Sequence, residues 1–162
     1  MSSVTAINGT PASNGSMTSE AARKDMIERF QALFQAMAGG RVAGLEGVYH
    51  PDVVFVDPFT RVQGLDALTH YFEGAYQNVI RCDFAFGATI ADDRGFCQPW
   101  TMSLRHRRLR KGELIQVDGI SQLTVDAGLV RLHRDYFDAG QLLYENVPLL
   151  GSAVRWLRRQ AV

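Results

Sequence analysis

The segment "VYHPDVVFVDPFTRVQGLDAL" (residues 48–68) changes from one secondary structure to another within a few residues. Residues 53–57 are a run of β-branched and aromatic side chains, which favours a strand, and Pro58 ends that run. From residue 64 to residue 78, Leu65, Leu68, Phe72 and Ala75 recur at helical spacing. The segment therefore predicts a short strand that is followed closely by a helix.

Two further helices are expected on the N-terminal side of this segment. The first begins near Thr18 and ends at Gly39-Gly40. Its apolar positions recur at helical spacing and are Met26, Ile27, Phe30, Leu33, Phe34 and Met37. The second is a short helix over residues 42–49, which His50-Pro51 breaks.

On the C-terminal side the pattern becomes β-rich. Strands are expected near residues 80–90, 96–109, 113–125 and 129–138, because the turn signals "ADDRG", "RKGE" and "VDAG" separate them. A helix over 139–146 follows. This order predicts an α+β fold in which a curved antiparallel sheet packs against three N-terminal helices. Such a sheet forms a cone, and the mouth of a cone suits a small-molecule pocket.

Length and composition indicate one globular domain. The chain has 162 residues, of which 46% are hydrophobic and 21% charged, and its formal net charge is +0. We expect a disordered tail over residues 1–17, because the tail has few bulky apolar groups. The domain is expected over residues 18–150, and a C-terminal amphipathic helix over 151–162.

Several classes of function are disfavoured. We expect no cofactor, because the sequence has no phosphate loop, zinc pattern or dinucleotide fingerprint. The basic stretch "RHRRLRKG" (105–112) is interpreted as a solvated hairpin end rather than a nucleic-acid site, since the net charge is zero. The C-terminal segment is expected to pack on the domain rather than on a membrane. The isolated Cys82 and Cys97, with no secretory signal, predict reduced thiols and a cytoplasmic protein.

The stretch "RLHRDYFDAG" (131–140) carries the most informative polar side chains. Read as a strand, it places His133, Asp135 and Phe137 on one face together with Arg131. If that face is the inner one, an imidazole and a carboxylate lie beside an aromatic ring inside the cone. The pattern thus predicts acid–base residues in the pocket.

Residues 48–68, the strands after them and "HRDYFD" (133–138) together resemble the nuclear transport factor 2-like superfamily, over roughly residues 20–150. This superfamily, with its cystatin-like cone, includes ketosteroid isomerases, SnoaL-like polyketide cyclases and limonene epoxide hydrolases. Asp57 in "FVDPF" resembles the general base of the isomerases. Asp135 in "HRDYFD" resembles a catalytic acid of the epoxide hydrolases.

The chain also departs from both patterns. The isomerases have an oxyanion-binding Tyr where Leu33 or Phe34 stands here, and a protonated Asp where Ser121 stands. The epoxide hydrolases have an Arg-x-Asp where this chain has Trp100 and Met102. The resemblance therefore implies a pocket with acid–base groups, but neither set of catalytic residues is complete.

The site is predicted as follows. Asp57, Asp135 and His133 are the candidate catalytic residues, because two carboxylates in an apolar cavity can divide into an acid and a base. The candidate substrate-binding residues are Phe34, Phe55, Trp100, Met102, Val117, Ser121 and Phe137. Three structural alternatives remain open: Asp57 only caps a turn, an arginine (Arg131 or Arg134) pairs with Asp135, and His133 is a wall residue.

The leading functional hypothesis is cofactor-independent acid–base catalysis on a hydrophobic small molecule, of the isomerase or cyclase type. One alternative is a limonene epoxide hydrolase-like hydrolase, which the missing Arg-x-Asp disfavours. Another is a protein that binds an apolar ligand without turning it over, or a dimeric scaffold. The resemblance further implies a homodimer that forms through the sheet.

Overall fold

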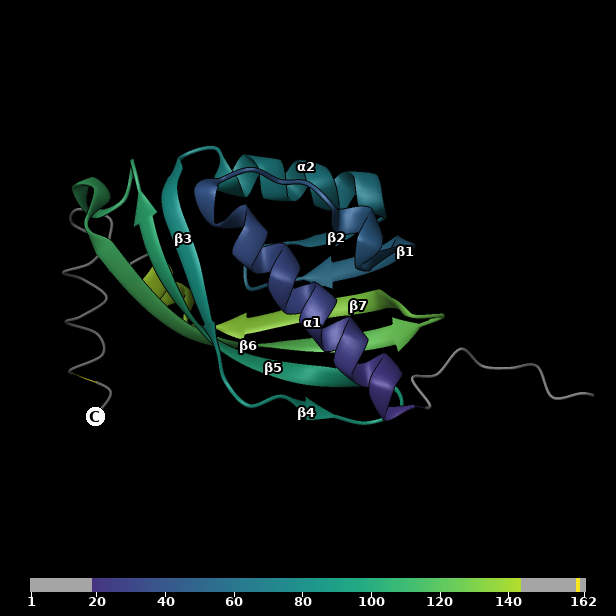
Figure 1. The fold of residues 1–162 in the computed structure, drawn as a ribbon. Helices are drawn as coiled ribbons and strands as arrows, with labels where there is room; N and C mark the ends of the chain where they lie inside the picture. Colours follow the sequence, from purple (N-terminus) through teal and green to yellow (C-terminus); the bar gives the residue numbers. More distant parts are fainter. Residues whose placement is uncertain (1–18, 144–159, 161–162) are drawn as a thin grey trace, which may run out of the picture.

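One curved sheet forms the body of the molecule, and its strands were largely expected (Figure 1). The computed structural model describes residues 19–143 and residue 160. The strands are β1 (Tyr49–Val56), β2 (Arg61–Gln63), β3 (Val79–Phe86), β4 (Ile90–Ala91), β5 (Gly95–His106), β6 (Leu114–Asp126) and β7 (Leu129–Phe137). The helices are α1 (Glu20–Ala36), α2 (Leu65–Tyr76) and α3 (Ala139–Leu142), with 3₁₀ turns at Met37–Gly39, Leu45–Gly47 and Arg110–Gly112.

The strand order is β2-β1-β7-β6-β5-β3, and β4 pairs with β5. All pairs are antiparallel except β1 and β7, which run parallel. The prediction of a curved α+β sheet is confirmed, but the sheet is mixed rather than purely antiparallel. The parallel pair joins the first and last strands within residues 19–143.

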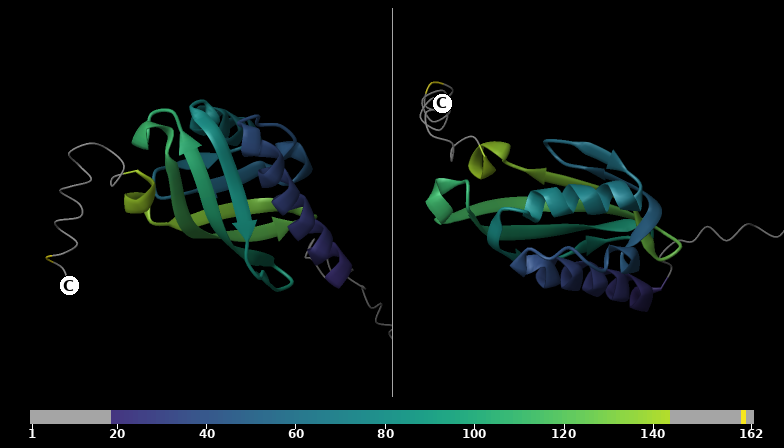
Figure 2. Two further views of the ribbon diagram at one scale, coloured as in Figure 1. Left: turned by 60° about the vertical axis from the view of Figure 1, so that its left-hand side comes forward. Right: turned by 90° about the horizontal axis from the view of Figure 1, so that it is seen from above.

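Helices α1 and α2 lie along the concave face of the sheet (Figure 2). Helix α1 begins after Ser19, whose hydroxyl oxygen accepts a hydrogen bond from the backbone N–H of Ala22 at 3.1 Å. It buries Met26, Phe30, Leu33 and Phe34 against the strands. Helix α2 buries Leu68, Phe72 and Tyr76. These are the faces that the helical periodicity predicted, and they form the roof over the inner surface of the sheet.

The prediction of a second helix over residues 42–49 is wrong. The chain forms a single 3₁₀ turn there, and strand β1 has already begun at Tyr49. Gly44 at the start of this turn has a φ of 82°, a left-handed conformation that an α-helix does not contain. The segment between this glycine and the strand is too short to nucleate an α-helix.

The long strands alternate as expected. In β6 the buried side chains include Ile115, Val117, Ser121 and Leu123, and the residues between them are mostly exposed. The buried side chains of β5, β6 and β7 meet those of α1 and α2 in one core. This core closes the narrow part of the cone and leaves a cavity beside it.

Several terminal predictions cannot be compared with the fold. The tail over 1–17 and, apart from Gln160, the helix over 151–162 lie outside the described residues. Of the helix expected over 139–146, α3 is described, and Asp138 caps it by accepting a hydrogen bond from Gly140 N–H at 2.7 Å. Within residues 19–143 and 160, no helix is long and apolar enough to span a membrane.

Candidate functional site

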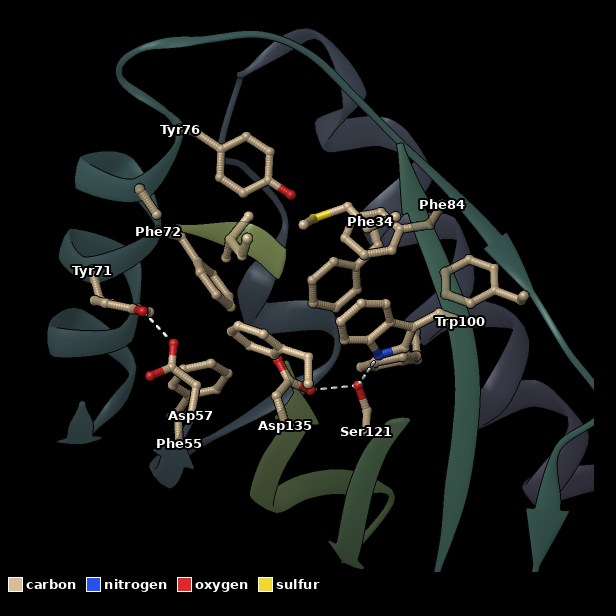
Figure 3. Close-up of a pocket in the computed structure, with 16 residues that line it drawn as sticks. Phe34, Phe55, Asp57, Tyr71, Phe72, Tyr76, Phe84, Trp100, Ser121 and Asp135 are labelled. Carbon is tan, nitrogen blue, oxygen red and sulfur yellow. Dashed lines mark hydrogen bonds between the residues drawn. The ribbon is translucent and has the colours of Figure 1, made fainter. Parts of the chain in front are cut away.

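A cavity of about 130 Å³ lies between the concave face of the sheet and helices α1 and α2 (Figure 3). It adjoins a second hollow of about 340 Å³, and the two share Asp57, Tyr71, Tyr76, Met102 and Phe137 among their lining residues. The walls are almost entirely apolar. The lining residues are Phe30, Phe34, Phe55, Asp57, Tyr71, Phe72, Ala75, Tyr76, Phe84, Phe86, Trp100, Met102, Ser121, Asp135, Phe137 and Leu142.

Asp57 lies just after strand β1 and has two roles at once. Its Oδ1 accepts hydrogen bonds from the backbone N–H groups of Phe59 and Thr60, both at 2.8 Å. Its Oδ2 accepts a hydrogen bond from the hydroxyl of Tyr71 on α2. The turn-capping alternative and the pocket-facing alternative therefore both hold, because each uses a different oxygen of the carboxylate.

Asp135 comes from β7 and is held by its neighbours on the sheet. The hydroxyl of Ser121, its register partner on β6, donates a hydrogen bond to Asp135 Oδ1 at 2.5 Å. Trp100 on β5 in turn donates its indole N–H to Ser121 Oγ at 2.9 Å. The other oxygen, Oδ2, has no hydrogen-bond partner among the described residues. None of their buried side-chain oxygens lacks a partner, so Oδ2 is accessible from the cavity.

His133 lies behind Asp135 rather than in the cavity wall. Its Nε2 is 2.8 Å from Asp135 Oδ1, and its Nδ1 is 2.8 Å from the hydroxyl of Tyr49. Both His133 and Tyr49 are completely buried. Burial, with Asp135 nearby, raises the pKa of Tyr49 well above its ordinary value, so its hydroxyl stays protonated. The hydroxyl donates a hydrogen bond to Nδ1 of His133. The imidazole then carries its proton on Nε2 and donates to Asp135.

The two aspartates are neighbours, not opposite walls of the pocket. In the parallel pair of β1 and β7, Phe55 is the partner of His133 and Val56 is the partner of Arg134. Asp57 comes directly after the end of β1 and Asp135 is the next residue within β7, and the two lie on one side of the cavity (Figure 3). The sequence did not reveal this adjacency, because it depends on the parallel pair.

Gly119 allows Trp100 to take its place in the cavity wall. The two are register partners on β6 and β5. A Cβ atom added at Gly119 would lie only 2.3 Å from the Trp100 ring, so any larger residue here would displace the indole. A glycine in the middle of a strand is the signal for such a close approach.

The other predicted site residues are mostly where they were expected. Phe34, Phe55, Trp100, Met102, Ser121 and Phe137 line the cavity. Val117 does not: it is buried in the core, because the alternation of a strand identifies the inner face but not the depth along it. The alternative in which Arg131 or Arg134 pairs with Asp135 is not what the structure shows. Arg131 bonds Asp52 at 2.9 Å, and Arg134 lies over the Tyr136 ring.

Other lining residues were not predicted as site residues. Tyr71 and Tyr76 are among them. Burial, together with contacts to Asp57 and Cys82 respectively, raises the pKa of both hydroxyls. In the adjoining hollow, burial raises the pKa of the Cys82 thiol to about 12. Phe84 and Phe86 could have been found from the alternation of β3, since residues two apart share a face.

The described residues show which metal ligands and charged side chains the site has. No group of three or more His, Cys, Asp or Glu side chains among them is placed to hold a metal ion. The cavity of about 130 Å³ is lined by two carboxylates and by no Lys, Arg or His side chain of the described part of the chain. Over the described residues, the site is thus an aromatic pocket whose charged side chains are both acidic.

Comparison with solved structures supports the fold. A protein of Jannaschia, assigned provisionally as a SnoaL-like polyketide cyclase, is similar with a TM-score of 0.63 and 12% identity over 74% of this chain and 90% of that one. AclR of Streptomyces galilaeus, whose assignment as a hydroxylase is provisional, is similar with a TM-score of 0.65 and 18% identity over 83% of this chain and 98% of that one. An LEH-like epoxide hydrolase of M. tuberculosis is similar with a TM-score of 0.58 and 20% identity over 73% of this chain and 79% of that one.

No curated protein matches the chain. The model of the SnoaL-like domain family, however, matches residues 30–133, which include α2 and run from the middle of α1 to His133 on β7. This match covers most of the chain and nearly all of the elements that build the cavity. The chain belongs to the SnoaL-like domain family.

Proposed function

We propose that this protein is a cofactor-independent acid–base enzyme that acts on a hydrophobic small molecule, as an isomerase or cyclase does. One observation carries the proposal: a carboxylate, Asp135, presents a free oxygen to an apolar cavity while three other side chains fix it from behind. A base that is held in place before the substrate arrives needs little reorganisation when it takes a proton.

In this proposal each polar residue has one role. Asp135 takes a proton from a carbon atom of the substrate with Oδ2 and returns it to another carbon. His133 and Ser121 position the carboxylate, since both donate to Oδ1 and leave Oδ2 free. Asp57, with the Tyr71 hydroxyl, orients the polar group of the substrate. The aromatic walls bind the apolar body of the substrate and exclude water.

An epoxide hydrolase of the limonene type is a weaker alternative. That reaction pairs its catalytic acid with an Arg-x-Asp, and here Trp100 and Met102 line the cavity at the corresponding positions. A protein that only binds its ligand is the second alternative. It needs the same apolar walls but gives no reason for a free carboxylate oxygen at the end of a hydrogen-bonded chain.

The experiment is proton exchange in heavy water, which needs no knowledge of the natural substrate. The protein is incubated with neutral aryl ketones and with aryl ketones that bear a quaternary ammonium group. Deuterium gained at the carbon next to the carbonyl is measured by mass spectrometry. We expect exchange above the buffer rate for at least one probe, and a loss of about 10²-fold or more in Asp135→Asn.

Asp118→Asn is the matched control, because Asp118 is an exposed aspartate of the same sheet that accepts a hydrogen bond from Thr101. It should exchange as fast as the unmodified protein. Equal rates in Asp135→Asn and Asp118→Asn would show that Asp135 is not the base. No exchange with any probe would leave the ligand-binding alternative as the better account.

A further inference from the structure

The cavity has an unusual balance of side chains. Ten of the sixteen described lining residues are aromatic, and the two charged ones are both aspartates. In the adjoining hollow the described lining includes one basic group, His106, whose pKa is lowered by burial and by Arg108, so it is uncharged at neutral pH. The site therefore offers a ligand negative charge and ring faces, without a compensating cation from the described part of the protein.

Asp57 is surrounded by donors only. Two backbone N–H groups and the Tyr71 hydroxyl all donate to its oxygens, and no described group accepts a proton from it. An ionised carboxylate has acceptor sites and no donor, so this arrangement suits the anion. Asp135 adds a second carboxylate beside it, with Oδ2 open to the cavity.

The charge of the ligand decides how well it fits such a site. A neutral apolar ligand would fill the aromatic walls, but it would strip water from two carboxylates and give them nothing in return. A cation of the same shape would compensate that loss by direct attraction to the carboxylates. It would also be attracted by the ring faces, since aromatic side chains bind ammonium groups in this way.

We infer that the ligand of this cavity is an apolar molecule that carries a cationic nitrogen, which lies against Asp57 and Asp135 within the aromatic walls. The inference deepens the proposed function, on which it rests only for the choice of the cavity. It also names the polar group that Asp57 orients.

A cationic substrate would supply what the site lacks for catalysis. The described lining has no obvious oxyanion stabiliser, because the Tyr71 hydroxyl already donates to Asp57. With an iminium substrate that also has a C=C bond between the β and γ carbons, Asp135 Oδ2 takes the proton from the α carbon, which lies next to the C=N⁺ group. The C–H electron pair forms a C=C bond, the C=N pair moves to nitrogen, and a neutral enamine results. Return of the proton to a conjugated carbon completes an isomerisation without any oxyanion.

The test compares two probes of one shape: phenyltrimethylammonium and tert-butylbenzene, which differ in having nitrogen or carbon at the branch point. Binding to the full chain is followed by quenching of tryptophan fluorescence, since Trp100 lines the cavity, and by calorimetry. We expect the cation to bind at least tenfold more tightly than the neutral probe. Equal or tighter binding of tert-butylbenzene would overturn the inference.

Variants locate the effect. Asp57→Asn keeps the turn, because an asparagine oxygen accepts the same backbone hydrogen bonds, and it should lose about tenfold in affinity for the cation. The double variant Asp57→Asn/Asp135→Asn should prefer the neutral probe. Asp118→Asn, on the outer face, should bind the cation as the unmodified chain does. If cation binding survives the double variant, the cation lies elsewhere and the inference fails.

The two proposals fail separately. Cation selectivity without any deuterium exchange would contradict the proposed enzyme and leave the inference standing. Exchange with neutral ketones, together with a preference for tert-butylbenzene, would contradict the inference and leave the enzyme standing.

Discussion

His133 Nε2 lies 2.8 Å from Oδ1 of Asp135, and the imidazole has no exposed surface. Rings surround it, because Phe30, Phe34 and Phe55 contact it edge to face and Tyr49 stacks against it. The imidazole therefore cannot reach a ligand. It acts through Asp135, which it joins to the buried Tyr49 hydroxyl.

The first prediction concerns this buried link. Tyr49→Phe removes a hydroxyl that donates to His133 Nδ1 and leaves that nitrogen buried without a partner. We expect a loss of about 1–3 kcal/mol in the free energy of unfolding. Urea denaturation at pH 7 measures it. The control is Tyr136→Phe, since the Tyr136 ring is 45% exposed, and it should change stability by less than about 0.5 kcal/mol. Equal losses in both variants would contradict a role for the link.

The second prediction concerns the floor of the cavity. Gly119→Ala places a methyl group within the volume of the Trp100 ring, so the indole must shift and its hydrogen bond to Ser121 must weaken. We expect a loss of about 1–3 kcal/mol in unfolding free energy and a changed tryptophan emission maximum.

Gly74→Ala is its control, because a Cβ atom at Gly74 on α2 meets nothing within 4 Å. Alanine favours a helix more than glycine does, so this variant should gain up to about 1 kcal/mol. A stable Gly119→Ala protein with unchanged emission would show that the indole has room to move.

The sequence was sufficient for the parts of the fold that depend on local pattern. The strict alternation in β6 and the helical spacing in α1 gave elements close to their observed bounds. Residues 42–49 were misread, because four apolar side chains at helical spacing (Val42, Leu45, Val48 and Tyr49) were weighed above Gly44 and Gly47 between them. The left-handed backbone of Gly44 decides that this segment is not an α-helix.

The site was predicted in its components but not in its arrangement. Asp57, Asp135 and six other lining residues could be found, since the periodicity of a strand or a helix assigns each side chain to a face. The adjacency of the two aspartates could not, because it follows from the parallel pairing of strands from opposite ends of the domain. Tyr71 was similarly hidden, since its contact with Asp57 depends on how α2 packs over β1.

The third prediction concerns self-association, which we propose occurs through the outer face of the sheet. On that face Arg134 lies over the exposed ring of Tyr136, which also donates a hydrogen bond to Gln122. We expect light scattering to give twice the chain mass of 18.0 kDa, and Tyr136→Glu to halve it. Ile90→Glu, on the separate strand β4, should leave it unchanged, since Ile90 is exposed at another edge. A monomeric unmodified chain would contradict the proposal.

The fourth prediction concerns the two cysteines. Burial raises the pKa of Cys82 to about 12, so at pH 8 only about one Cys82 thiol in 10⁴ is ionised. The thiolate is the reactive form, and Cys97 is the more exposed residue. We expect iodoacetamide to modify Cys97 first, with Cys82 modified only when the protein is unfolded in urea. Peptide mass spectrometry assigns the sites, and equal rates in the folded protein would contradict the structure.

The last prediction concerns alkaline stability. Tyr49, Tyr71 and Tyr76 all have pKa values raised chiefly by burial, so between pH 10 and the folded pKa they ionise in the unfolded chain but not in the folded one. The unfolded state then holds fewer protons, and stability falls as pH rises, by about 1.4 kcal/mol per pH unit for each of Tyr49 and Tyr76 and by less for Tyr71, which is only partly buried. Below pH 10 the contribution of these tyrosines to stability is complete.

We expect urea midpoints to fall steeply above pH 10, and less steeply in Tyr76→Phe, which has one buried hydroxyl fewer. Tyr136→Phe should keep the full slope, because it leaves the hydroxyls of Tyr49, Tyr71 and Tyr76 in place. If Tyr76→Phe and the unmodified chain had the same slope, the Tyr76 hydroxyl would have to ionise within the folded protein, which its buried position disfavours.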